Sequence, residues 1–209
     1  MSAEVKHWHV TYNDIHNLIR RCTPKISAEF NPDLLVAIGG GGFFPARVMR
    51  TFLREQTTNK TLQIQAIGLS LYEPVEGTTV EQLGEEVVRT QWLGPNSGEL
   101  LLGKRVLIVD EVDDTRKTLG YALFELQKDV ELEAARCPES EREALLGATK
   151  FGIFVVHNKK KPKLVELPAG VPYYSGEEVG NIWVEYPWEA SNIEEHDRLA
   201  AAERSGTNP

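Results

Sequence analysis

The sequence contains a cluster of four carboxylates within five positions, Asp110, Glu111, Asp113 and Asp114. The cluster directly follows the apolar run 106–109. Carboxylates at the end of a buried strand repel one another unless cations or ligand hydroxyl groups offset their charge. An arbitrary acidic run forms a solvated turn, but this position favours carboxylates that accept hydrogen bonds from a sugar diol or neutralise a developing cation.

A hydroxyl-rich and cationic segment comes next, made of Thr115, Arg116, Lys117 and Thr118. Because a helical pattern of apolar residues follows, its backbone N–H groups and hydroxyls can converge on an anion at a helix N-terminus. The segment lacks the glycines of a Walker loop. The glycine cluster 39–42 also fails the GxGxxG pattern, because Phe44 occupies the place of the last glycine. We therefore expect a phosphate site outside the two common nucleotide motifs.

These loops need elements that hold them at one edge of the molecule. Apolar runs and apolar residues at helical spacing predict strands that alternate with helices. That alternation predicts an α/β fold, a parallel sheet flanked by helices with ligands bound at the carboxyl ends of the strands. The expected strands are 34–38, 64–69, 106–109 and 151–156. The expected helices are 15–22 after a capping box at 11–14, then 45–53 and 119–126.

Two further segments have no fixed place in this alternation. The connection 71–104 is long for a compact domain. It is either a lid over the site or a hairpin with a strand near 86–92. Residues 200–209 have the composition of a frayed tail.

Length, charge and composition exclude several classes of protein. At 209 residues, the chain suits one domain whose core needs neither disulfides nor metals. The formal net charge of -8 argues against a nucleic-acid partner, because phosphate backbones attract basic patches. No apolar run approaches the roughly 18 residues that span a bilayer. The N-terminus shows no signal-peptide pattern, so we expect a cytoplasmic protein without a membrane partner.

The apolar run, acidic pair, apolar residue, second acidic pair and basic segment with threonines resemble the phosphoribosyl diphosphate (PRPP) signature of the type I phosphoribosyltransferases. Segments 69–73, 89–92 and 186–188 resemble the fungal 6-oxopurine members, the hypoxanthine-guanine and xanthine enzymes. The resemblance implies one domain over 1–209, with a core at about 10–160. A hood at about 160–196 together with the N-terminal segment, a mobile lid loop and a tail at 200–209 would complete it.

The resemblance also implies an activity in purine salvage. The enzyme would transfer 5-phosphoribosyl from PRPP to N9 of hypoxanthine, guanine or xanthine, giving IMP, GMP or XMP and pyrophosphate with Mg²⁺. A homodimer is expected. Two alternatives stay open, a regulator of the same fold that binds PRPP without catalysis and a transferase for another base.

Residue roles follow from the same resemblance. Asp110 and Glu111 would bind the ribose hydroxyls of PRPP, with metal binding as a second possibility, and Asp114 would approach the purine N7 and manage its proton. The segment 114–118 would hold the 5′-phosphate, and Asp113 receives no role in ligand binding. Relatives outside fungi commonly have glycine where Arg116 stands, so this side chain either points to solvent or adds charge near the phosphate.

The glycine cluster matches the loop that receives pyrophosphate, through Gly39, Gly40 and Gly41. Family members have a cis peptide there, which we expect between Gly40 and Gly41 or, as the alternative, between Gly39 and Gly40. A cis bond costs about 3 to 4 kcal/mol, so the loop would store strain. Four glycines could also simply make a flexible turn.

For the purine, Trp183 would stack on the base, Val184 would meet its edge, and Glu189 would lie near the 2-position and a second magnesium ion. Lys159 would donate to the 6-oxo group, which favours oxopurines over adenine. Ser70 and Tyr72 would belong to a lid that excludes water. The remaining assignments are a solvated basic run at Lys160, Lys161 and Lys163, core packing for Trp188, and a structural or rim role for His157.

Overall fold

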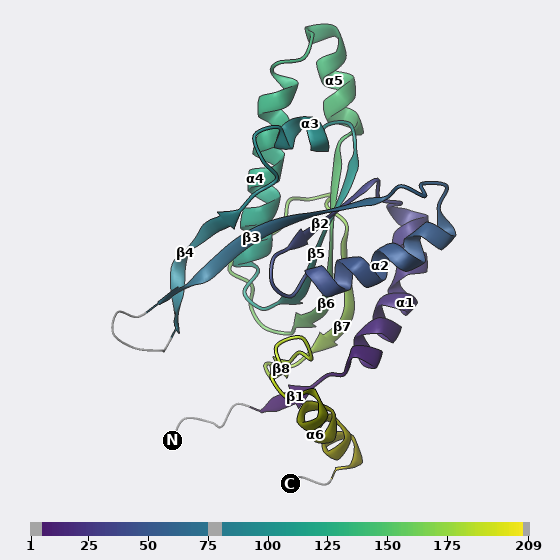
Figure 1. Cartoon of the computed structure of the whole chain (residues 1–209). Coiled ribbons are helices and arrows are strands. Elements are labelled where there is room, and N and C mark those ends of the chain that lie inside the picture. Colours follow the sequence, from purple (N-terminus) through teal and green to yellow (C-terminus); the bar gives the residue numbers. More distant parts are fainter. Residues whose placement is uncertain (1–5, 75–80, 207–209) are drawn as a thin grey trace.

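The computed structural model describes residues 6–74 and 81–206, with the backbone alone at 71–74 and 81–86. Its strands are β1 (His7–His9), β2 (Leu34–Ile38), β3 (Gln63–Pro74), β4 (Glu81–Gln91), β5 (Arg105–Asp113), β6 (Lys150–Lys159), β7 (Tyr173–Val179) and β8 (Trp183–Glu185). A six-stranded sheet in the order β4-β3-β2-β5-β6-β7 forms the centre (Figure 1). Every pair in it is parallel except β3 and β4.

Helices cover both faces of this sheet (Figure 1). The helices of the described residues are α1 (Tyr12–Glu29), α2 (Phe43–Gln56), α3 (Ser97–Leu101), α4 (Lys117–Ala134), α5 (Glu139–Ala148) and α6 (Ile193–Ser205). Successive residues of a strand point to opposite faces. In β2, Leu35 and Ala37 join the core under α1 and α2, whereas Val36 joins the core under α3 and α4. Because both faces are buried, β2 is apolar throughout.

A second, two-stranded sheet joins distant parts of the chain. β1 and β8 pair in parallel, with Trp8 opposite Val184. α6 holds β1 in place, since the backbone N–H of His9 donates to Glu203 and His196 contacts the Val10 carbonyl at 2.9 Å. Figure 1 shows this small sheet and α6 beyond the ends of β6 and β7. The structure thus brings the N-terminal segment and residues 183–185 together.

The main elements appear where the sequence predicts them. β2 has the predicted bounds, and the predicted strands at 64–69, 106–109 and 151–156 all lie within longer strands. Thr11 is the N-cap of α1, and the predicted capping box is confirmed by bonds from the Asp14 N–H to Thr11 Oγ1 and from the Thr11 N–H to Asp14 Oδ2.

Several boundaries differ from the sequence predictions. β5 continues to Asp113, so three of the four clustered acids lie on a strand and not in a turn. The connection 71–104 contains the β3–β4 hairpin and α3, which favours the hairpin alternative, although 75–80 lie outside the described residues. The prediction of a frayed tail is wrong for residues 200–205, because they belong to α6. Within the described ranges, no helix has the length and apolar character to cross a membrane.

Candidate active site

The acidic pair lies at the carboxyl end of β5, the central strand between β2 and β6. Asp110 is buried, and its Oδ1 accepts the backbone N–H of Glu111 at 3.0 Å. Burial raises the pKa of Asp110 well above its usual value, and the neighbouring charges of Glu111 and Asp113 add to the shift. Glu111 Oε2 is buried and has no hydrogen-bond partner among the described residues. The pair therefore has room for a cation or for ligand hydroxyls that would satisfy it.

The glycine cluster connects β2 to α2 and faces this pair. Gly40 has a φ of +85°, which a residue with a side chain rarely adopts. A Cβ at Gly41 would lie 1.9 Å from the Glu111 carboxyl carbon, and one at Gly42 would lie 2.5 Å from the Val109 carbonyl oxygen. The predicted cis peptide is wrong, because the described residues contain none. The left-handed Gly40 makes the turn instead.

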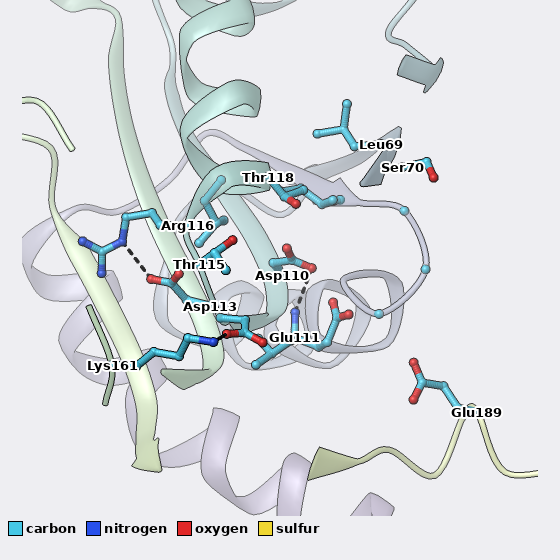
Figure 2. Close-up of a pocket in the computed structure, with 17 residues that line it drawn as sticks. Leu69, Ser70, Asp110, Glu111, Asp113, Thr115, Arg116, Thr118, Lys161 and Glu189 are labelled. Carbon is cyan, nitrogen blue, oxygen red and sulfur yellow. Dashed lines mark hydrogen bonds and ion pairs between the residues drawn. The ribbon is translucent and has the colours of Figure 1, made fainter. Parts of the chain in front are cut away.

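The segment Asp114 to Thr118, called the phosphate loop below, follows β5 and leads into α4. The N-cap of α4 is Arg116, with a φ of 68° and a ψ of 3°. The Arg116 side chain runs from the loop to the Asp113 carboxylate, away from Asp110 and Glu111 (Figure 2). The alternative in which this side chain points to solvent is therefore wrong, because it forms an ion pair with a buried acid. Its contribution of charge near the phosphate stays a prediction. Thr115 accepts the Lys117 N–H at 3.4 Å, so this hydroxyl faces the start of the helix.

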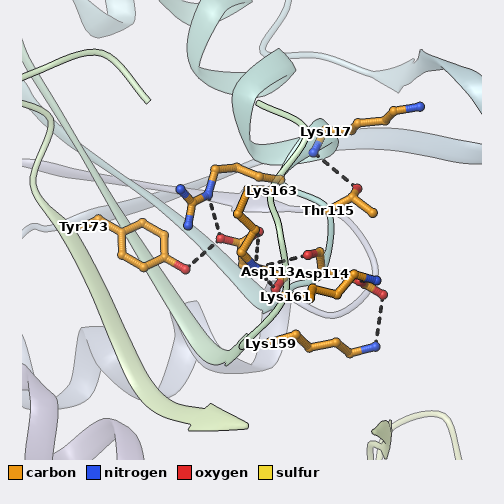
Figure 3. Close-up of polar contacts among 9 residues, drawn as sticks. Asp113, Asp114, Thr115, Lys117, Lys159, Lys161, Lys163 and Tyr173 are labelled. Carbon is orange, nitrogen blue, oxygen red and sulfur yellow. Dashed lines mark hydrogen bonds and ion pairs between the residues drawn. The ribbon is translucent and has the colours of Figure 1, made fainter. Parts of the chain in front are cut away.

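Asp114 lies between two lysines (Figure 3). Lys159 donates to its Oδ2 at 3.0 Å, and Lys161 pairs with its Oδ1. Burial would raise the pKa of Asp114, but hydrogen bonds from Lys161 and Lys159 and their charges outweigh it, so the pKa is lowered. The carboxylate is thus ionised and able to accept a proton at neutral pH.

The basic run after Lys159 is not simply solvated, as the sequence suggested. Lys160 fits that expectation, pairing with Glu178 at the surface. Lys161 instead contacts Asp114, and Lys163 donates to the carbonyl oxygens of Asp113 at 2.7 Å and Asp114 at 3.0 Å. The sequence offered no signal for this, because a run of lysines after a strand looks the same whether the side chains meet solvent or a distant acid.

A cavity of about 150 Å³ has the composition of a base site. Trp183 is 49% exposed at its mouth, with the Lys159 ammonium 5.6 Å from the indole centroid. Val184 is buried. Tyr186 and the acids Glu111, Asp114 and Glu189 complete the wall. A half-exposed indole next to a lysine can stack on a flat ring while the lysine donates to an oxygen on it. The predicted base residues are therefore brought together.

A second cavity, of about 340 Å³, is lined by the acidic pair, by the glycines Gly39, Gly40 and Gly41, and by the phosphate loop except for Lys117 (Figure 2). Ser70 lies at its wall, whereas the side chain of Tyr72 lies outside the described residues. The two cavities share four lining residues, Glu111, Val112, Asp114 and Glu189. Burial raises the pKa of Glu189, and the charges of Glu111 and Glu185 contribute.

An aromatic column supports the wall between hood and sheet. Trp188 stacks on Tyr186 at 4.8 Å and on Phe44 at 5.4 Å, which agrees with packing. The Tyr186 hydroxyl donates to the Glu111 carbonyl at 3.1 Å and contacts His157 Nδ1 at 2.8 Å. His157 is 2% exposed, and burial lowers its pKa to about 4, so it is a neutral structural histidine. Tyr186 and Phe44 were missed by sequence reasoning.

The carboxylates of the site show whether it suits a magnesium ion. Among the described residues, no group of three or more His, Cys, Asp or Glu side chains could hold a metal. Mg²⁺ is commonly held by one or two carboxylates together with substrate phosphates and water. The pair of Asp110, which is buried, and Glu111, whose buried Oε2 is unpartnered among the described residues, fits such an ion when a phosphorylated substrate supplies the other ligands.

No protein-family model matches the chain. Among curated proteins, it is 50% identical over 198 residues to a hypoxanthine-guanine phosphoribosyltransferase of Schizosaccharomyces pombe, covering 91% of this chain and 93% of that protein. It is 44% identical over 213 residues to xanthine phosphoribosyltransferase 1 of Saccharomyces cerevisiae, covering 96% of this chain and 98% of that protein.

Two solved structures extend the comparison. A hypothetical protein from Neisseria gonorrhoeae with bound ppGpp is 38% identical, with a TM-score of 0.73 over 97% of this chain and 99% of that one. A purine phosphoribosyltransferase from Pyrococcus horikoshii, 24% identical, has a TM-score of 0.61 over 90% of this chain and 97% of that one, and shows a shared fold. The predicted type I phosphoribosyltransferase fold is confirmed. With the sequence identities, these findings show that the chain belongs to the family of hypoxanthine-guanine and xanthine phosphoribosyltransferases.

Proposed function

We propose that this protein acts in purine salvage by transferring the 5-phosphoribosyl group of PRPP to N9 of a 6-oxopurine, releasing pyrophosphate. Hypoxanthine, guanine and xanthine are the bases named for its curated relatives. The bacterial relative with bound ppGpp, a guanine nucleotide, supports a site of this fold that takes guanine together with phosphates. IMP, GMP and XMP would be the nucleotide products.

One observation carries the proposal. The base cavity and the phosphate cavity are adjoining and share Glu111, Val112, Asp114 and Glu189. A bond between N9 of a base in the first cavity and C1 of a ribose in the second would form at this common wall. Holding both reactants in that geometry supplies much of the catalysis in a transfer of this kind.

The acids and the glycines would bind PRPP. Asp110 and Glu111 would accept hydrogen bonds from the ribose hydroxyls, and their negative charge would stabilise the cationic, oxocarbenium-like transition state. Gly39, Gly40 and Gly41 would present backbone N–H groups to pyrophosphate. The phosphate loop, Asp114 to Thr118, would hold the 5′-phosphate at the N-terminus of α4.

A bound Mg²⁺ would neutralise charge on the leaving pyrophosphate. Asp110 and Glu111 fit such an ion best, and Glu189, which lines both cavities as Glu111 does, is the candidate for a second. Ser70 and Tyr72 would belong to the segment that closes over the site and excludes water.

The lysines would recognise the base and keep the Asp114 carboxylate ionised. Lys159 would donate to the 6-oxo group, a contact that adenine cannot make with its amino group. Asp114 would accept the N7 proton as the base reacts, since its lowered pKa keeps it ionised beforehand. Trp183 would stack on the purine, and the backbone of Val184 would contact its edge.

The proposal extends to the whole chain. A core at about 10–160, with a hood from about 160–196 and the N-terminal segment, would form one catalytic unit, supported by the pairing of β1 with β8. By family resemblance, we expect a cytoplasmic homodimer.

A steady-state assay tests the proposal. The protein is incubated with PRPP, Mg²⁺ and, separately, hypoxanthine, guanine, xanthine and adenine, and nucleotide and pyrophosphate are measured. We expect turnover with at least one oxopurine, little with adenine, and loss of turnover on chelation of the metal. PRPP binding without product from any base would favour the regulator, and turnover of adenine alone would favour a transferase for another base.

A further inference from the structure

A buried ion-pair cluster lies behind the phosphate loop, outside the roles assigned above. The Asp113 side chain has no exposed surface. Its Oδ2 accepts hydrogen bonds from Arg116 Nε at 2.9 Å and from the Tyr173 hydroxyl at 2.8 Å (Figure 3). Lys163 Nζ lies 3.3 Å from its Oδ1. Asp113, Arg116, Lys163 and Tyr173 are called the loop clamp below.

The clamp holds a backbone conformation that arginine rarely adopts. Arg116 has a φ of 68°, and a left-handed residue with a long side chain persists only where the surroundings hold it. Its guanidinium carbon lies 4.9 Å from the Tyr173 ring centroid, in addition to the bond with Asp113. Burial and the charge of Asp113 raise the pKa of Tyr173, so its hydroxyl remains a donor. Arg116 is therefore fixed at both its backbone and its guanidinium.

The segment after β6 fixes the carbonyl groups of the same loop. Lys163 Nζ binds the Asp113 and Asp114 carbonyls, and the Leu164 N–H donates to the Thr115 carbonyl at 3.0 Å. The C=O and N–H of a trans peptide point in opposite directions. With three successive carbonyls held on one side, the N–H groups of Asp114, Thr115 and Arg116 are turned to the other. The larger cavity is lined by these residues.

We propose that the side chains of Asp113, Arg116, Lys163 and Tyr173 position loop 113–116 so that its backbone N–H groups bind the 5′-phosphate, while these four side chains do not touch the substrate. The inference rests on the proposed function. It predicts a defect specific to the phosphate, because none of the four clamp residues lines the base cavity, whose walls include Trp183 and Val184.

The test compares a nucleotide with its nucleoside. Dissociation constants for IMP and inosine, which differ only in the 5′-phosphate, are measured by calorimetry on the whole chain and on Tyr173→Phe, Asp113→Asn and Arg116→Gly variants. We expect each variant to bind IMP about tenfold more weakly, with inosine binding changed by less than about twofold. The KM for PRPP should rise in parallel, and that for the base should not.

Glycine at 116 separates the side chain from the backbone. It accepts a φ of 68° without strain and removes the guanidinium. If the arginine had no positioning role, Arg116→Gly would bind IMP as well as the unaltered chain, and that result would overturn the inference. Because members of one network do not act independently, adding Asp113→Asn to Arg116→Gly should weaken IMP binding by less than about threefold further.

One matched control variant and one mild variant separate a loss of loop positioning from a general loss of stability. Arg198 and Glu195 form an exposed ion pair with the same spacing on α6, so Arg198→Ala should leave both constants unchanged. Tyr173→Phe removes a single hydroxyl and remains informative if another variant fails to fold. Equal weakening of IMP and inosine would show a merely structural cluster and overturn the inference. Failure of the unaltered chain to make nucleotide or bind IMP would overturn the proposed function, and this inference with it.

Discussion

Gly41→Ala should disable the site while leaving the fold intact. Gly41 has an ordinary negative φ or extended backbone, since it is absent from the positive-φ residues, so alanine fits its conformation. The new Cβ would nevertheless lie 1.9 Å from the Glu111 carboxyl carbon and 2.1 Å from its Oε2. The far end of a flexible side chain must therefore move.

The size of the effect follows from that distance. To reach ordinary van der Waals contact at 3.4 Å, the Glu111 carboxylate must shift by about 1.5 Å. A misplacement of about 1 Å at a reacting centre can cost about 100-fold in rate. We therefore expect kcat/KM for PRPP to fall about 100-fold, which corresponds to about 2.7 kcal/mol. The free energy of unfolding should change by less than about 1 kcal/mol, because the displaced oxygen has no partner to lose.

Steady-state kinetics with varied PRPP measure the first quantity, and urea denaturation measures the second. Gly147→Ala, on α5 with open space around the new methyl group, is the control and should match the unaltered chain in activity. The double variant Gly41→Ala/Glu111→Ala should be within about threefold of Glu111→Ala alone, because the methyl group acts through Glu111.

Two results would refute this reasoning. Activity of Gly41→Ala within about threefold of the unaltered chain would show that Glu111 need not keep its position. If Gly41→Ala also lowered kcat/KM about 100-fold in the Glu111→Ala background, the methyl group would block pyrophosphate directly and would not act through Glu111.

Three other predictions concern the carboxylate, lysines and histidine around the base cavity. Asp114→Asn cannot accept a proton, so kcat should fall by at least about 100-fold while the KM for PRPP changes less than about threefold; near-normal turnover would remove its proton role. Lys159→Ala should raise the KM for the base about tenfold and Lys161→Ala less, because Lys159 lies at the indole; the reverse order would move the 6-oxo contact to Lys161. His157 has a pKa lowered from 6.5 to about 4, so between these values the unfolded chain binds a proton that the folded chain does not. Stability should therefore fall as pH drops from 6.5 to 4, by about 3 kcal/mol from this residue, and urea denaturation of His157→Gln should lack that component.

Much of the fold was predictable because its determinants are local. The strand at 34–38 is buried on both faces by parallel neighbours, so it is a continuous apolar run with clear ends. Thr11 and Asp14 define the start of α1 through bonds between residues three apart. The acidic pair and the phosphate loop were predicted for the same reason, since each occupies consecutive positions after one strand.

The glycine cluster was recognised as a loop, but the sequence misjudged its geometry. The predicted cis bond rested on family resemblance, and the turn is made by a left-handed Gly40. The need for glycine at 41 comes from Glu111, which approaches it from another strand. A requirement of that kind is invisible until both strands are placed in one sheet.

By itself, the sequence determined the order of the four central strands and of three helices, the position of the acidic pair, and the resemblance to the family. The tertiary structure alone decided where the charged side chains go. Lys161 reaches Asp114, and Lys163 reaches Asp113, because the segment after β6 lies against the end of β5. Local patterns record burial and backbone preference, whereas the partner of an ion pair depends on which distant segment the fold brings within about 4 Å.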